Sequence, residues 1–172
     1  MPPICKVKET DMPSKSATND AKAKLVVRHA RAADVSAVQK LYKKVYPGMS
    51  AYSADQLRGQ INNFPQGQFV ATYEDEIVGY CATFRIAEAI AFGPHTWWQI
   101  TGNGFAARHD PAGDWLYGME VFVDPDFRGL RIGQRLYAAR KALATELHLK
   151  GIVFGGRIPG YARRSKKIGS PR

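Results

Sequence analysis

The sequence predicts an α/β protein with a mixed sheet flanked by helices. Strand-like and helix-like segments follow one another in the order β-α-α-β-β-β-α-β, and two of the strands form a hairpin. A strand, a glycine-bearing loop and an amphipathic helix succeed one another in residues 115–148. Chains that mix hairpins with helical crossovers form sheets covered by helices. The strict βαβ alternation of a dinucleotide-binding fold is absent.

The composition predicts one domain with loose ends. The chain has 172 residues and is 45% hydrophobic, which is enough to build a core. It contains no apolar run of the roughly 20 residues that span a membrane, and its first residues lack the apolar stretch of a secretory signal. Cys5 and Cys81 do not have the spacing of a disulfide framework or a zinc site. We therefore expect a cytoplasmic protein without a metal and without a membrane partner.

The net charge of +10 is concentrated at the C-terminal end of the chain. Residues 157–172 contain six basic residues and no acidic one, residues 1–23 have a net charge of +1, and +3 is left for the central part. A basic tail can bind nucleic acid, but it is more often a solvated segment that keeps a protein in solution. Nucleic acid is thus an expected partner only through this tail.

The first half of the chain contains two predicted helices after one strand. Residues 1–23 are rich in Lys, Ser and Pro and are predicted to be disordered, whereas 24–29 read as a strand. Apolar residues recur at helical spacing over 34–46, and Pro47-Gly48 ends that helix. Ser53 is a predicted N-cap for the second helix.

The second half is predicted to complete the sheet. Residues 68–73 and 77–86 are strands of an antiparallel hairpin joined by an acidic turn. Residues 93–114 are rich in Gly, Pro and His and are predicted to be an irregular connection. The remaining predicted elements are a strand over 115–123, a helix over 130–148 with Ile132, Leu136, Ala139, Leu143 and Leu147 facing the core, and a fifth strand over 152–154.

The loop before the long helix has the residues of an anion site. It reads Arg128-Gly129-Leu130-Arg131-Ile132-Gly133, and the two glycines allow a ligand to approach the backbone closely. The unpaired N–H groups of a helix start and the positive end of its dipole favour a diphosphate, and two arginines add charge. An ordinary strand-to-helix turn is the alternative. The combination of strand, Asp-Pro turn, glycines and arginines favours the anion site.

Here the chain resembles a family. The string VDPDFRGLRIGQRL is similar to the cofactor motif of the GCN5-related N-acetyltransferases, whose pattern Arg/Gln-x-x-Gly-x-Gly/Ala cradles the pyrophosphate of acetyl-CoA. Arg128 takes the first position, Gly133 takes the last, and Arg131 replaces the middle glycine. The longer string up to RIPGY resembles acetyltransferase domains fused to a carbon–nitrogen hydrolase, although no hydrolase domain is present. The resemblance covers residues 24–156 and implies the acyl-CoA N-acyltransferase fold.

The resemblance implies a site for acetyl-CoA at the end of the strand over 115–123. Residues Val121, Phe122 and Val123 would contact the cofactor, with pantetheine hydrogen-bonded to the backbone of Val121 and Val123 like an added strand. The fifth strand would splay away to make room. An amine, either a small molecule or a protein amine, would then attack the thioester directly. The implied activity is N-acetyl transfer.

Direct attack needs a base for the amine and an acid for the thiolate. Glu120 is the nearest carboxylate on the cofactor strand, so it is a candidate base, although it can equally be a salt-bridged residue of the sheet. Tyr161 is a candidate acid. His109 and Asp110 can line the acceptor site or serve as loop residues. Tyr117 stands where some relatives carry a glutamate base.

The family fold normally continues beyond the fifth strand, but only about 16 residues follow Gly156. We therefore expect a fold truncated after that strand, with residues 157–172 as a basic tail. A homodimer is one way to cover the exposed strand edge. Two alternatives to catalysis stay open: a non-catalytic acyl-CoA-binding or regulatory domain left from a fused enzyme, and a basic nucleic-acid-associated protein.

Overall fold

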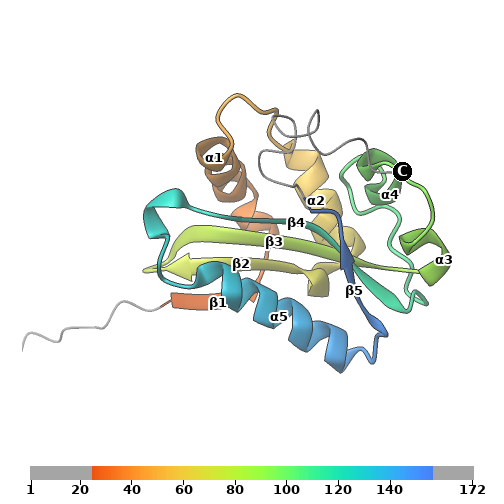
Figure 1. Ribbon diagram of the computed structural model, residues 1–172. Helices are drawn as coiled ribbons and strands as arrows, with labels where there is room; N and C mark the ends of the chain where they lie inside the picture. Colours follow the sequence, from red (N-terminus) through yellow and green to blue (C-terminus); the bar gives the residue numbers. More distant parts are fainter. Residues whose placement is uncertain (1–24, 157–172) are drawn as a thin grey trace, which may run out of the picture.

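A computed structural model describes residues 25–156 of the chain (Figure 1). These residues form a five-stranded sheet in the order β1-β2-β3-β4-β5. Strands β1 to β4 are antiparallel neighbours, and β5 runs parallel to β4. The strands are β1 (Leu25–His29), β2 (Gln68–Tyr73), β3 (Glu76–Ile86), β4 (Trp115–Val123) and β5 (Gly151–Phe154). The α-helices are α1 (Val35–Val45), α2 (Ala54–Asn63), α3 (Glu88–Ala91), α4 (Trp97–Thr101) and α5 (Ile132–Glu146).

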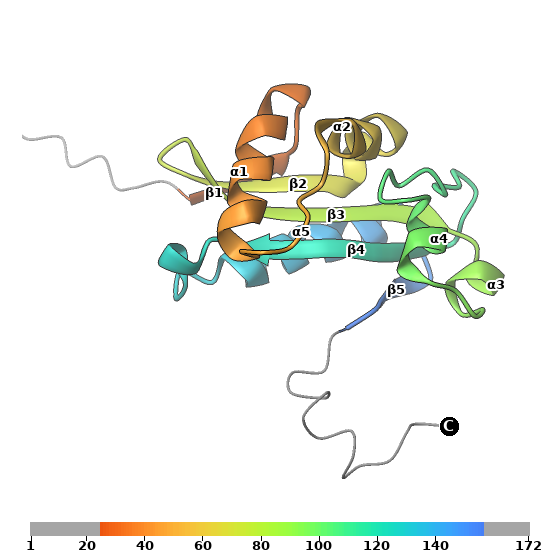
Figure 2. The same ribbon diagram turned by 90° about the horizontal axis from the view of Figure 1, so that it is seen from above.

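The helices cover the two faces of the sheet unequally. Figure 2 shows α1 and α2 together on one face and α5 on the other. Helix α1 packs on β3 and β4, whereas α5 packs on β2, β3 and β4 from the opposite side. The predicted mixed sheet flanked by helices is therefore confirmed. No helix in residues 25–156 is long and apolar enough to cross a membrane.

The predicted elements are found with small shifts at their ends. The acidic turn between β2 and β3 places Glu74 and Asp75 at positive φ, as a tight hairpin requires. Ser53 caps α2 in a capping box in which its side chain accepts a hydrogen bond from the Gln56 backbone. Helix α5 begins at Ile132 and ends at Glu146, so it is shorter at both ends than the predicted helix.

The predicted irregular connection contains a short helix. Residues 93–114 were expected to lack regular structure, but α4 occupies five of them. Thr96 and Gln99 form a capping box at its start, and Gly102 ends it in the left-handed conformation. Hydrophobic periodicity does not detect a helix this short, because it completes little more than one turn. The capping pair was the available signal.

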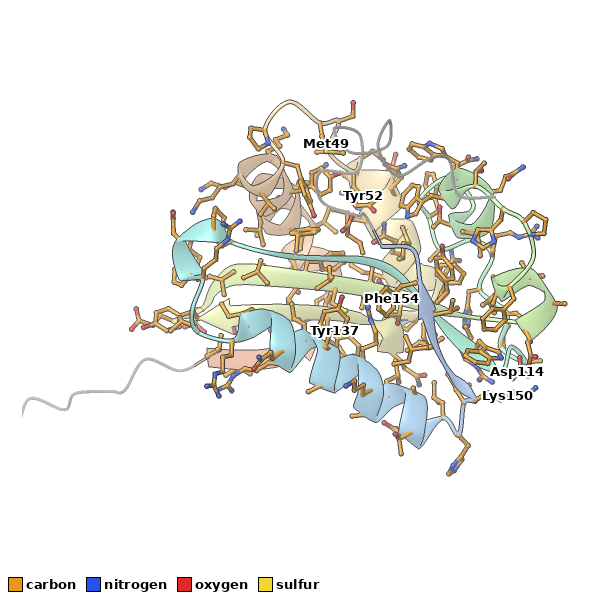
Figure 3. All side chains as sticks on the ribbon, in the orientation of Figure 1. Met49, Tyr52, Asp114, Tyr137, Lys150 and Phe154 are labelled. Carbon is orange, nitrogen blue, oxygen red and sulfur yellow. The ribbon has the colours of Figure 1, made fainter. Side chains whose placement is uncertain are left out.

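A charged cluster fixes where β5 starts. Lys150 forms an ion pair with Asp114 at 2.6 Å (Figure 3) and another with Glu88 at 2.8 Å. The lysine therefore ties the start of β5 to the start of β4 and to α3. The two carboxylates raise the pKa of Lys150 above its usual value. From Lys150 onward, β5 runs at a steep angle to the other strands (Figure 1).

The pairing of strand β4 with both of its neighbouring strands changes near its middle. It pairs with β5 only from Trp115 to Gly118, where Gly118 lies opposite Phe154. On its other side, the register with β3 shifts because Ala82 lies opposite Glu120 and Thr83 opposite Gly118. Met119 is the additional residue in this β-bulge. From the bulge onward, no strand of the described residues pairs with the outer edge of β4.

Candidate functional site

The loop after β4 is anchored to α1 by a buried carboxylate. Asp124 is almost fully buried and accepts a hydrogen bond from the backbone of Asp126 at 2.9 Å. Lys44 of α1 reaches both carboxylates at 2.8 Å. These bonds raise the pKa of Lys44, so its ammonium stays charged. The turn Pro125–Phe127 is therefore fixed before the chain enters residues 128–133, which we call the glycine loop.

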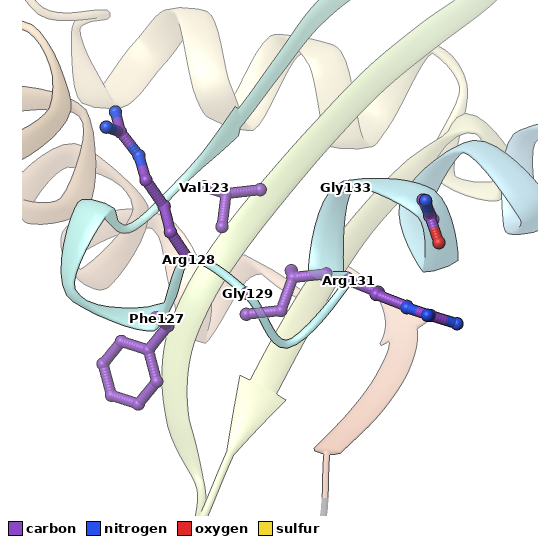
Figure 4. A pocket seen from close by; sticks show the side chains of 8 residues that line it. Val123, Phe127, Arg128, Gly129, Arg131 and Gly133 are labelled. Carbon is purple, nitrogen blue, oxygen red and sulfur yellow. The ribbon is translucent and has the colours of Figure 1, made fainter.

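The glycine loop and the start of α5 surround a cavity of about 310 Å³ (Figure 4). Six of the predicted cofactor residues line the cavity, together with two that the sequence did not indicate. They are Val123, Arg128, Gly129, Arg131, Ile132 and Gly133, joined by Phe127 and Gln134. Leu130, a seventh predicted residue, does not line it and has an exposed side chain. Gln134 is in the first turn of α5, which starts two residues later than the predicted helix, so a correct helix start could have identified it.

The start of α5 leaves its backbone donors open. The hydrogen bond from the Arg135 amide to the Arg131 carbonyl (3.1 Å) closes the first turn, and no side chain caps the N-terminus. Helices α2 and α4, by contrast, both have capping boxes. Uncapped amides and the helix dipole attract anions. The cavity therefore combines free N–H donors with the positive charges of Arg128 and Arg131.

Two residues of the loop have left-handed backbone conformations. Gly129 has φ of 95°, which glycine adopts without strain. Arg131, the N-cap of α5, has φ of 56° and ψ of 27°. A side chain with a Cβ atom is strained in this region by about 1 kcal/mol or more. The arginine that replaces the family's middle glycine thus occupies a conformation that glycine would adopt more easily.

The outer edge of β4 leads from this cavity to the bulge. Val121 and Val123 are half-buried, and the Val121 amide donates a hydrogen bond to the Glu120 carboxylate at 3.1 Å. The Val121 amide is thus bonded to a side chain and not to the neighbouring strand β5. The side chain of Phe122 points to the face of the sheet that α1 covers, where it packs on Tyr42 and Tyr80. Phe122 can therefore offer a ligand only its backbone.

Glu120 lies at the bulge on the face covered by α1 and α2. Its carboxylate accepts a hydrogen bond from the Tyr52 hydroxyl at 3.4 Å. Burial, followed by the negative charge of Glu120, raises the pKa of Tyr52 far above its usual value, so this hydroxyl remains a donor. Tyr52 precedes the N-cap of α2, and no sequence pattern connected it with β4.

Aromatic side chains surround the bulge on the same face. The Trp97 indole donates a hydrogen bond to the Met119 carbonyl at 3.3 Å, and its ring lies 6.1 Å from that of Tyr52. The Tyr117 hydroxyl lies 3.5 Å from Nε2 of His95. The sequence favoured a packing role for the tryptophans. Trp97 does pack against the core, but it also bonds directly to the bulge.

The predicted acceptor-site residues His109 and Asp110 have other partners. Nδ1 of His109 accepts a hydrogen bond from the Arg85 backbone at 3.2 Å, and its ring stacks on Phe64. Burial and then the charge of Arg85 lower the pKa of His109. Asp110 accepts a hydrogen bond from the backbone of Ala112 within its own loop. None of these contacts joins the two residues to Glu120 or to the glycine loop.

Several predictions fall on parts of the chain that the structure does not describe. Tyr161, the disorder of residues 1–23 and the basic tail 157–172 all lie outside residues 25–156. Within that range, no group of three or more His, Cys, Asp or Glu side chains could hold a metal ion.

Comparison with known proteins identifies the family. Residues 35–157 match the model of the acetyltransferase (GNAT) family. The chain therefore belongs to this family.

The chain is also similar to two curated proteins of Bacillus subtilis (strain 168). It is 40% identical over 145 residues to the probable hydrolase YhcX, an alignment that covers 84% of this chain and 28% of the relative. It is 31% identical over 134 residues to the uncharacterised N-acetyltransferase YkwB, covering 78% of this chain and 59% of the relative. The chain thus spans less than two thirds of the length of either relative. YhcX is named as a hydrolase, and the chain covers only 28% of its length. Both facts agree with the predicted resemblance to acetyltransferase domains fused to a hydrolase.

A solved structure shares both fold and sequence with the chain. It is the GphF GNAT-like decarboxylase in complex with isobutyryl-CoA, with a TM-score of 0.71 and 28% identity. The alignment covers 84% of this chain and 72% of that one. The five-stranded sheet and its helices are therefore the GNAT fold.

Proposed function

We propose that this protein transfers an acyl group from acyl-CoA to an amine, with acetyl-CoA as the donor. The observation that carries the proposal is the continuity of the site. An uncapped helix start with two arginines adjoins the free edge of β4, which leads directly to the bulge and Glu120. The diphosphate would bind at the helix start, as anions do elsewhere.

Pantetheine would extend the sheet from the diphosphate to the bulge. Its amides would hydrogen-bond to the backbone of Val121 and Val123, as a peptide does when it is added to a sheet edge. The Val121 amide would then exchange its bond with the Glu120 carboxylate for one with the ligand. Binding of the donor would thereby release the carboxylate at the bulge, where the thioester would lie.

Glu120 would then act as the base for the incoming amine. The amine nitrogen attacks the thioester carbonyl, the new C–N bond forms, and the C–S bond breaks as the tetrahedral intermediate collapses. The proton of the amine passes to Glu120, and the thiolate of CoA takes up a proton from an acid. Tyr161 stays a candidate for that acid. Tyr52 would keep Glu120 oriented through its hydroxyl.

The acceptor would approach from the face on which α1, α2 and α4 lie. Tyr52, Trp97 and Tyr117 form an aromatic wall beside the bulge there, and both tyrosines are buried. A small-molecule amine and a protein amine are both compatible with this wall. His109 and Asp110 line this acceptor site only if the acceptor is long enough to reach the Arg85 end of β3. A cytoplasmic location and a homodimer remain part of the proposal.

A second candidate function is decarboxylation of a carboxylated acyl-CoA. The specific observation in its favour is the 28% identity to a GNAT-like decarboxylase. In that reaction the C–C bond to the carboxylate breaks, CO₂ leaves, and the electron pair forms the enolate of the thioester, which is then protonated. A malonyl thioester would give acetyl-CoA without any amine.

Three measurements separate these functions from one another and from a non-catalytic acyl-CoA-binding role. Calorimetric titration with acetyl-CoA tests binding, and the variant Arg128→Ala, compared with the exposed Lys141→Ala on the outer face of α5, assigns it to the loop. Release of free thiol from acetyl-CoA with a panel of amines tests transfer, and conversion of malonyl-CoA to acetyl-CoA tests decarboxylation. Binding without either reaction supports the non-catalytic domain. No binding at millimolar ligand would overturn the acyl-CoA proposal.

A further inference from the structure

Arg140 is a charged residue in the core of the protein. It lies on the inner face of α5, and only 1% of its surface is exposed. Its position follows Ile132 and Leu136 at intervals of four residues, so the helix places it against the sheet. A buried guanidinium is costly unless hydrogen bonds or an opposite charge compensate it. The groups that surround Arg140 must therefore compensate its charge.

The guanidinium lies beneath the β-bulge. Its Nη2 donates to the carbonyl of Glu120 at 2.9 Å and to that of Ala82 at 3.3 Å. Ala82 and Glu120 face each other on β3 and β4 directly beside the extra residue Met119. One nitrogen therefore bonds to both strands at the point where their ladder is irregular.

The neighbours of Arg140 leave room for it and shield it. A Cβ atom at Gly118 would lie 2.8 Å from Nη1, so the absence of a side chain there makes space for the guanidinium. The Tyr137 ring lies 5.2 Å below the guanidinium carbon and 6.2 Å from the Phe154 ring. Figure 3 shows Tyr137 and Phe154 near each other, between α5 and β5.

The charge of Arg140 has no counter-anion among the described residues. None of their ion pairs includes it, and its Nε lacks a hydrogen-bond partner. The nearby thiol of Cys81 does not serve, because burial raises its pKa more than Arg140 lowers it and the thiol stays neutral. A positive charge thus remains fixed under the bulge.

We propose that Arg140 is a positioning residue for acyl transfer: by holding the carbonyls of Ala82 and Glu120 together, it fixes the bulge and with it the place of the Glu120 carboxylate. This inference rests on the proposed function, because it assigns Glu120 as the base. The positive charge also favours negative charge that develops above it, such as that on the thioester oxygen. Arg140 acts through β4 and does not touch the acceptor.

The test compares Arg140→Gln and Arg140→Lys with Lys141→Gln, which removes an exposed charge from the next position of the same helix. For Arg140→Gln we expect kcat to fall by about 100-fold, the size of effect that a small misplacement of a catalytic group produces. The Kd for CoA, measured by calorimetry, should stay within about 3-fold because the diphosphate cavity does not include Arg140. Arg140→Lys should recover part of the rate, since its ammonium can reach one of the two carbonyls.

A second readout does not depend on activity. Hydrogen exchange of the amides at 119–121 should accelerate by about 10-fold in Arg140→Gln and stay unchanged in Lys141→Gln. A folded Arg140→Gln protein with kcat within about 3-fold of the parent, or with unchanged exchange at the bulge, would overturn the inference. If Arg140→Gln does not fold, the same comparison is made with Arg140→Lys. A parent protein that neither binds CoA nor transfers acyl groups would refute the proposed function, and the exchange experiment would still decide the role of Arg140 in the bulge.

Discussion

The glycine loop and the β4 bulge are the two ends of the proposed site, but they are built in opposite ways. The loop is contiguous in sequence, open to solvent, and defined by donors that have no partner, since α5 begins without a cap. The bulge is assembled from β3, β4 and α5 and is closed by the buried guanidinium of Arg140. An open set of amides can receive a ligand, whereas a closed network holds side chains in one geometry.

This difference separates binding from chemistry along β4. Changes in the loop should alter affinity for the donor and leave the rate constant of the bound complex nearly unchanged. Changes at the bulge should do the reverse. Variants that fail to follow this division would show that the two ends are coupled.

The largest effect is expected at the bulge. Glu120→Gln keeps the size of the side chain and an acceptor for the Tyr52 hydroxyl, but it removes the proposed base. We expect kcat to fall by about 100-fold or more, the usual contribution of general base catalysis. The Kd for acetyl-CoA should change by less than about 3-fold. Steady-state kinetics together with calorimetry measure both quantities, and a rate close to that of the parent would exclude Glu120 as the base.

At the loop, Gly133 offers a matched pair of variants. A Cβ atom at this position meets no other atom within 4 Å, so Gly133→Ala should fold normally and bind acetyl-CoA within about 3-fold of the parent. Gly133→Asp adds a negative charge beside the diphosphate and should weaken binding by about 30-fold, roughly 2 kcal/mol. The same carboxylate at a helix start favours folding, so the melting temperature should not fall. Equal affinities of the two variants would contradict a diphosphate site.

The sequence predicted the loop far better than the bulge. Five of the six residues from Arg128 to Gly133 line the cavity, and they were predicted because a strand, a turn and a helix start lie in one short stretch of chain. Tyr52 and Trp97 were missed as neighbours of the bulge, since their contacts depend on how α2 and α4 pack on the sheet. Arg140 falls on the buried helical stripe, but a search for apolar residues alone excluded it. Its spacing of four residues from Leu136 predicts that it faces the sheet, whatever the residue type, and this spacing was the signal that could have found it.

Replacing Arg131 tests whether its positive charge favours ligand binding while its backbone conformation lowers the stability of the protein. Arg131→Gly relieves the left-handed conformation at φ of 56°, so we expect the free energy of unfolding to rise by about 1 kcal/mol. The variant also loses a positive charge from the cavity, and acetyl-CoA affinity should fall by about 5-fold, as for one exposed charge. Thermal unfolding and calorimetry should therefore move in opposite directions. A loss of both stability and affinity would mean that the arginine side chain stabilises the loop.

The smallest effect is expected at His109, whose contacts include neither the glycine loop nor the bulge. Burial and Arg85 lower its pKa, so the folded protein binds the proton less readily than the unfolded chain. As the pH falls below about 6.5, the unfolded state takes up the proton first and stability is lost. Above that pH the contribution of the neutral imidazole is fully present.

The variant His109→Asn isolates this titration, because its amide oxygen can replace Nδ1 as the acceptor for the Arg85 backbone. Between pH 7.5 and 5.5, the melting temperature of the parent should fall by about 1 °C more than that of the variant, which is the scale of a weak, partly exposed group. His148→Asn, at an exposed position, serves as the control for the removal of a histidine. If His109→Asn instead lowers kcat at pH 7.5 while the melting temperature is unchanged, His109 acts on the acceptor, and the division between the loop and the bulge must be extended to a third region.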